Sequence, residues 1–132
     1  DNGVKIKMII RGICCLIPTQ HKNIKIISII DRFLEHTRIF IFNNNKKNET
    51  YISSADWMTR NLDNRVEVTC PIHDSKIKKE INDIFNIYWS DNVKSRLINQ
   101  KDANVYKSDI KKSNSIRSQL EIYNYYKSKI EN

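Results

Sequence analysis

The sequence predicts an α/β fold in which helices pack on a mixed sheet. Three observations support this fold class: strand-like segments dominate the first half of the chain, amphipathic helical stretches follow, and one strand is apolar along nearly its whole length. A strand of that kind is covered on both faces and favours a parallel neighbour. The length of 132 residues suits one domain or part of one.

Two strands are expected near the N-terminus. In residues 4–10 apolar side chains alternate with lysines, the period-two pattern of a half-buried strand, and Arg11 follows at the strand's end. Residues 24–30 form the nearly continuous apolar run, rich in isoleucine, that predicts the strand covered on both faces.

The middle of the chain predicts a hairpin and then a helix. Residues 37–42 and 50–53 favour strands, and the polar stretch 43–48 between them reads as a loop of turn-forming residues. Further on, Asp74 or Ser75 is suited to cap a helix with one apolar stripe. The stripe consists of Ile77, Ile81, Ile84, Phe85 and Tyr88.

The last third predicts two more helices separated by a loop. A short helix is expected to carry Val93 and Leu97, and residues 99–114 lack periodicity and are expected to form a loop. A final helix is expected where three apolar residues recur at helical spacing. These are Ile116, Leu120 and Tyr123.

The net charge of +8 favours polyanionic partners, among them nucleic acid, anionic lipid, phosphorylated ligands and inorganic phosphate chains. Composition alone does not choose among them. Cys14, Cys15 and Cys70 are expected to be buried free thiols, because their spacing fits no disulfide framework. Neither they nor the three histidines show zinc-site spacing. No stretch approaches the ~20 consecutive apolar residues of a membrane span.

A candidate site lies where the hairpin begins and returns. His36 and Arg38, two positions apart on a strand, would share one face, where a phosphoryl group can meet a proton donor beside a fixed positive charge. Ser54 and Asp56 would present a hydroxyl and a carboxylate from the paired strand. The alternative is structural, because a strand histidine more often satisfies local hydrogen bonds than takes part in catalysis.

This pattern resembles one half of the phospholipase D superfamily motif, H-x-K-x4-D followed by G-S-x-N. The motif histidine corresponds to His36. The departures are Arg38 for the lysine, Asn43 for the aspartate, Ser53 for the glycine and Asp56 for the asparagine.

Four ordered segments together resemble the C-terminal domain of bacterial-type, histidine-dependent polyphosphate kinase: residues 9–18, 27–42, 51–68 and 91–99. Of these, the stretch from Ser53 to Val68 is the most specific. The resemblance implies a phospholipase D-like domain, a mixed sheet flanked by helices and incomplete at its N-terminal side. Residues 1–132 would then be the C-terminal catalytic domain, a fragment whose upstream domains are missing.

The resemblance also implies an activity. The family moves the terminal phosphoryl group of ATP reversibly onto inorganic polyphosphate through a phosphohistidine, with Mg²⁺ whose ligands are expected upstream. The expected partners are therefore ATP, ADP and polyphosphate, with no nucleic acid and with a homo-oligomer in the full-length protein. We expect a cytoplasmic location, either free or peripherally attached to a membrane.

Individual roles follow from the matched positions. His36 matches the second domain's histidine, which contacts nucleotide phosphate and assists transfer, whereas the phosphorylated histidine lies upstream. Arg11 matches an arginine at the ATP phosphates, and Arg65 and Glu67 match polar residues that line the same site. Arg38 suits such a site because guanidinium binds phosphate in a bidentate manner.

Two other functions stay open. The first alternative is a catalytically silent module that binds polyanions such as polyphosphate. Binding that weakens steeply with salt, without phosphoryl transfer, would support it. The second alternative is a phosphodiesterase or nuclease of the wider superfamily. Arg38 and Asn43, which depart from the superfamily motif, argue against it.

Overall fold

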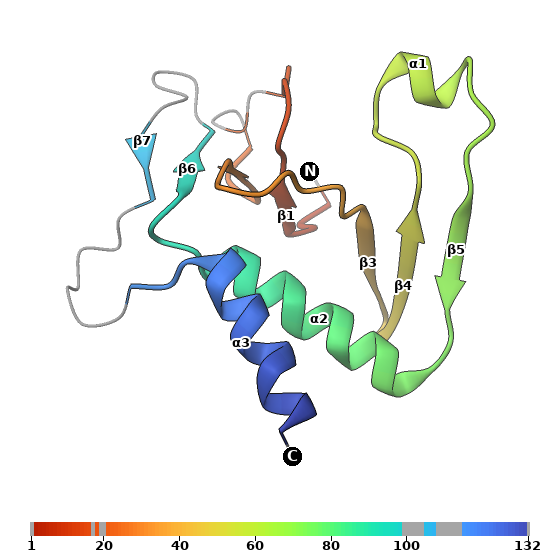
Figure 1. Cartoon of the computed structure of the whole chain (residues 1–132). Coiled ribbons are helices and arrows are strands. Elements are labelled where there is room, and N and C mark those ends of the chain that lie inside the picture. Colours follow the sequence, from red (N-terminus) through yellow and green to blue (C-terminus); the bar gives the residue numbers. More distant parts are fainter. Residues whose placement is uncertain (1, 17, 19–20, 99–104, 108–114, 132) are drawn as a thin grey trace. The chain divides into compact units, whose positions relative to one another are not determined.

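The computed structural model describes residues 2–16, 18, 21–98, 105–107 and 115–131, and it forms two compact units. Unit 1 comprises the described parts of Asp1–Leu34 and Phe85–Asn132, and unit 2 is Glu35–Ile84. The helices are α1 (Thr59–Leu62), α2 (Ser75–Ser90) and α3 (Ser118–Ile130). With one sheet in each unit, the predicted α/β class is confirmed (Figure 1).

Unit 1 contains a mixed sheet. Its strands, in spatial order, are β1 (Ile6–Ile9), β2 (Ile24–Ile29), β6 (Ser95–Leu97) and β7 (Val105–Tyr106). β1 and β2 are parallel, as predicted, and the other pairings are antiparallel. The neighbours Ile26 and Ile27 point to opposite faces and are 3% and 2% exposed, so β2 is covered on both sides as its composition indicated.

Buried Asp91 organises the region after α2, where the predicted short helix is wrong. The expected short helix with Val93 and Leu97 does not form, and Leu97 lies in β6. One carboxylate oxygen of Asp91 accepts the N–H groups of residues 93–95 at 2.7 to 3.0 Å, which turns the chain away from a helix. The other oxygen accepts the Ser118 N–H at 2.7 Å and so fixes the start of α3.

Two further expectations for the C-terminal third need correction. Ile116 precedes α3 rather than lying on it. The loop expected at 99–114 contains β7 at Val105 and Tyr106, and residues 99–104 and 108–114 lie outside the described residues.

An ion pair with two hydrogen bonds links the chain just after β2 to the start of α3. Arg117 donates Nε to Asp31 Oδ2 at 2.8 Å and a second N–H to Asp31 Oδ1 at 2.6 Å. The side chain of Asp31 is 2% exposed. Two parallel bonds give this pair a defined geometry that a single contact lacks.

Acid is expected to weaken unit 1 through this pair. Arg117, with help from the Arg32 N–H, holds the pKa of Asp31 below its ordinary value against the opposing effect of burial. The resulting stabilisation is present above the unfolded pKa of about 4 and is lost as the pH falls through the lower folded pKa. Denaturant unfolding of the chain measured across this range should depend on pH less steeply in Asp31→Asn than in the exposed control Asp63→Asn. Equal slopes would contradict this role.

Unit 2 contains an antiparallel sheet of β3 (Ile39–Asn44), β4 (Lys47–Ser53) and β5 (Thr69–Ile72). The predicted hairpin is confirmed, but the loop expected at 43–48 is wrong in extent. The strands continue until Asn45 and Lys46 turn the chain with φ of 46° and 67°. Two residues with positive φ form the type of turn whose twist suits a hairpin.

Local contacts settle several smaller expectations. Asp74, rather than Ser75, caps α2, because its Oδ1 accepts the N–H groups of Lys76 and Ile77 at 2.8 and 2.9 Å. The three thiols are free but not buried as expected: Cys14 is half-buried, and Cys15 and Cys70 are exposed. No helix among the described residues is both long and apolar enough to cross a membrane.

Candidate functional site

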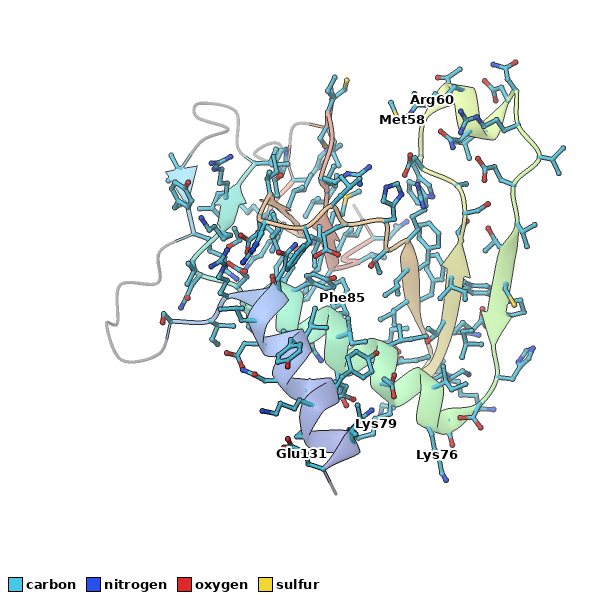
Figure 2. The ribbon with its side chains drawn as sticks, viewed as in Figure 1. Met58, Arg60, Lys76, Lys79, Phe85 and Glu131 are labelled. Atoms are coloured by element: carbon cyan, nitrogen blue, oxygen red, sulfur yellow. The ribbon has the colours of Figure 1, made fainter. Side chains whose placement is uncertain are left out.

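The candidate site lies at one end of the unit 2 sheet. His36 and Arg38 come just before β3, Asp56 comes after β4, and Glu67 comes before β5. Antiparallel strands bring these four positions to the same end, opposite to the β3–β4 turn (Figure 1). The connection from β4 to β5 contains α1, beside which Figure 2 labels Met58 and Arg60.

Arg38 is the central cation. Its Nε donates to Asp56 Oδ1 at 2.8 Å, and a terminal N–H donates to the backbone carbonyl of His36 at 3.0 Å. The side chain is 22% exposed, so part of the guanidinium still faces solvent. The hydrogen bond with Asp56, then the negative charges of Asp56 and Glu67, raise the pKa of Arg38. The group therefore stays cationic throughout the working pH range.

His36 is exposed, and its place differs slightly from the prediction. The hairpin strand begins at Ile39 rather than at His36. Backbone pairing still extends to Arg38, whose carbonyl accepts the Ser53 N–H at 3.0 Å. Because Arg38 also holds the His36 carbonyl, the backbone that carries the imidazole is tied to the guanidinium.

Glu67 is half-buried, and both of its carboxylate oxygens accept hydrogen bonds. Oε1 accepts from Asn61 Nδ2 at 2.7 Å, and Oε2 accepts from the Ser54 hydroxyl. These two bonds, Ser54's the larger in effect, lower the pKa of Glu67, and the positive charges of Arg65 and Arg38 add to the shift. Glu67 is consequently an ionised acceptor at neutral pH.

Ser54 is held by the backbone of Val68. Its N–H donates to the Val68 carbonyl and its Oγ accepts the Val68 N–H, both at 3.0 Å. Arg65 and Glu67 both lie in the connection before β5 rather than on a strand. That connection needs such side-chain support, since it lacks the bonds of a strand ladder.

The structure brings together part of the predicted site. His36, Arg38 and Asp56 are in direct contact through hydrogen bonds, and Glu67 acts on Arg38 through its charge. Arg11 is exposed and belongs to unit 1, whereas these four residues belong to unit 2. Asn43 supports the hairpin turn instead, where its Oδ1 accepts the Lys46 N–H at 3.0 Å.

Asn61 could not be predicted as part of the site. It lies in α1, a helix of four residues, and no periodic pattern marks so short an element. The ring of Trp57 stacks on Phe40 with centroids 5.3 Å apart, although Trp57 is 67% exposed.

A partly exposed guanidinium tied to the backbone of an exposed histidine suits an anion such as a phosphate group. A metal centre has less support. Within the described ranges there is no group of three or more His, Cys, Asp or Glu that could hold a metal ion. Both oxygens of Glu67 are engaged by protein donors, and Asp56 Oδ1 is engaged by Arg38.

Comparisons with known proteins agree with one another. Residues 1–119 match the family model described as polyphosphate kinase C-terminal domain 2. The chain is 52% identical over 130 residues to a polyphosphate kinase of Vibrio parahaemolyticus, covering 95% of this chain and 18% of the relative. It is 45% identical over 133 residues to that of Escherichia coli K12, covering 97% and 19%.

A solved structure shows the same likeness. The crystal structure of polyphosphate kinase from Porphyromonas gingivalis aligns with a TM-score of 0.92 at 46% identity, covering 98% of this chain and 20% of that one. The chain therefore spans about a fifth of the length of these relatives.

Proposed function

Because the chain belongs to the polyphosphate kinase C-terminal domain 2 family, we propose that it forms part of a longer enzyme that transfers the terminal phosphate of ATP reversibly to inorganic polyphosphate. In this proposal residues 1–132 are the C-terminal phospholipase D-like catalytic domain. The observation that carries the proposal is the link between Asp56, Arg38 and His36, which ties a permanent cation to the backbone of an exposed histidine.

The roles of these residues follow from the chemistry of phosphoryl transfer. The transferred group is loosely bonded in the transition state, so the protein chiefly positions it and neutralises charge. Arg38 and Arg65, and Arg11 from unit 1, bind phosphate oxygens, because guanidinium groups match phosphate geometry. His36 donates a proton to a leaving oxygen or stabilises it as imidazolium.

The covalent step belongs elsewhere in this proposal. The phosphohistidine forms on a histidine of the longer enzyme outside this chain, and His36 acts on the nucleotide side. Glu67, with its oxygens engaged, orients the arginines rather than exchanging protons.

Mg²⁺ is expected from the family resemblance, but the residues described above do not fit it. The candidate carboxylates accept hydrogen bonds from protein donors. We therefore propose that ligands for the ion come from the rest of the longer enzyme, and no step assigned to this chain uses it. ATP, ADP and polyphosphate are the proposed substrates, in a cytoplasmic homo-oligomer.

A chimera tests this function. This chain replaces the matching stretch of the Vibrio parahaemolyticus polyphosphate kinase, to which it is 52% identical. With ATP and Mg²⁺ the chimera should make polyphosphate, whereas the isolated chain and the relative without that stretch should not. A folded chimera without activity, next to an active parent enzyme, contradicts the proposal.

The same experiment separates the alternatives. Binding of polyphosphate that falls steeply with salt, without transfer by the chimera, would favour the silent polyanion-binding module. Cleavage of a phosphodiester substrate by the chain would favour a phosphodiesterase. Polyphosphate synthesis by the isolated chain would show that the site needs no other part of the enzyme.

A further inference from the structure

Asn61 is the most deeply buried polar residue of unit 2 near the candidate site. It is 2% exposed although α1, to which it belongs, is short and otherwise exposed. Its Nδ2 donates to Glu67 Oε1 at 2.7 Å. Its Oδ1 is buried and accepts no hydrogen bond from any residue that the structure describes.

The buried amide oxygen of Asn61, unpaired among the described residues, costs folding free energy, which a role of the amide must offset. A buried carbonyl oxygen without a donor loses the hydrogen bonds that water would give it. Leucine has a similar size and would fill the position without that loss. Glu67 explains the choice, because an ionised carboxylate can only accept, so the amide must present its N–H₂ group and leave Oδ1 unsatisfied.

The charges around Glu67 show what would change without the amide. Arg65 from the same connection and Arg38 from the start of β3 both act on this carboxylate. Arg38 also faces Asp56. A carboxylate released from Asn61 is free to turn toward these guanidinium groups and to compete with phosphate for them.

We propose that Asn61 is a positioning residue that, together with Ser54, holds Glu67 away from the phosphate-binding faces of Arg38 and Arg65. The effect on ATP binding rests on the proposed function, whereas the positioning of Glu67 by Asn61 does not. Asn61 acts through Glu67 and does not itself touch the phosphate. Held in this way, the Glu67 carboxylate orients the two arginines and leaves their phosphate-binding faces open.

The first arm of the test uses the isolated chain. Asn61→Leu removes the hydrogen bond at similar size, and Asn64→Leu makes the same change at an exposed position of the same connection. The pKa of Glu67, followed by NMR of its carboxyl carbon, should rise by about one unit in Asn61→Leu and stay unchanged in Asn64→Leu. Asn61→Asp places a second carboxylate against Glu67 and should raise it further. An unchanged pKa in both Asn61 variants overturns the proposal.

The second arm measures the chimera. In Asn61→Leu the KM for ATP should rise at least about tenfold, with a smaller loss in kcat, and the acidic limb of the pH profile should move to higher pH. Thermal unfolding should show Asn61→Leu to be no less stable than Asn64→Leu. A raised Glu67 pKa with an unchanged KM and pH profile would reduce Asn61 to a structural role. If the unmodified chimera is inactive, the proposed function fails while the NMR arm still decides whether Asn61 holds Glu67.

Discussion

Replacing His36 by alanine in the chimera is expected to lower the rate of polyphosphate synthesis by about 10²- to 10⁴-fold, the usual contribution of a positioned acid or base. The imidazole is exposed, and Arg38 holds the backbone beneath it. Alanine therefore removes the ring without creating a cavity, and stability should change little. The initial rate and the unfolding temperature of the same preparation check both statements.

A matched control is available in the same unit. His73 is exposed between β5 and α2, outside the candidate site, and His73→Ala should retain full activity. His36→Asn, which keeps a neutral polar group but cannot act as an acid or base, should be impaired nearly as much as His36→Ala. Full activity in His36→Ala would remove this residue from the mechanism and leave the arginines as simple anion binders.

Elements with a strong local pattern could be predicted from the sequence. The apolar run of β2 reflects burial on both faces, and the stripe on α2 reflects burial of one face around Ile81, so each carries a periodic signal. β5 could not be predicted, because Pro71 interrupts its strand pattern and nothing in the sequence indicates which strand it pairs with. In the structure Pro71 lies opposite Tyr51 on β5, which among the described strands has only β4 beside it, and a missing N–H is tolerated at such an edge.

The site divides in the same way. The spacing of His36 and Arg38, with Asp56 just after the returning strand rather than on it as expected, follows from the hairpin and could be predicted to this extent. The partners of Glu67 could not, because Ser54 and Asn61 meet it only through the path of the β4–β5 connection. Such contacts depend on tertiary geometry, for which neither propensity nor periodicity carries a signal.

Arg38→Lys is expected to lower kcat/KM for ATP by about 10²- to 10³-fold, the range found when a positioned electrostatic donor is lost. Lysine keeps the positive charge but has a single ammonium group in place of a planar fork. Arg38 uses Nε for Asp56 and a terminal N–H for the His36 carbonyl. The three donors of a lysine share one nitrogen, so they cannot reproduce the separate positions from which Nε and the terminal nitrogens of Arg38 reach their partners.

Stability should distinguish this effect from damage to the fold. The Arg38 and Asp56 side chains are 22% and 30% exposed, so their ion pair contributes about 1 kcal/mol or less to folding. Arg38→Lys should therefore unfold close to the unmodified chimera, and Arg60→Lys, an exposed change on α1, serves as the control for both measurements. Asp56→Asn keeps the guanidinium but removes its charged partner, and should impair activity less than Arg38→Lys. If Arg38→Lys is fully active, charge alone suffices at this position, and the geometry that joins Asp56, Arg38 and His36 has no catalytic role.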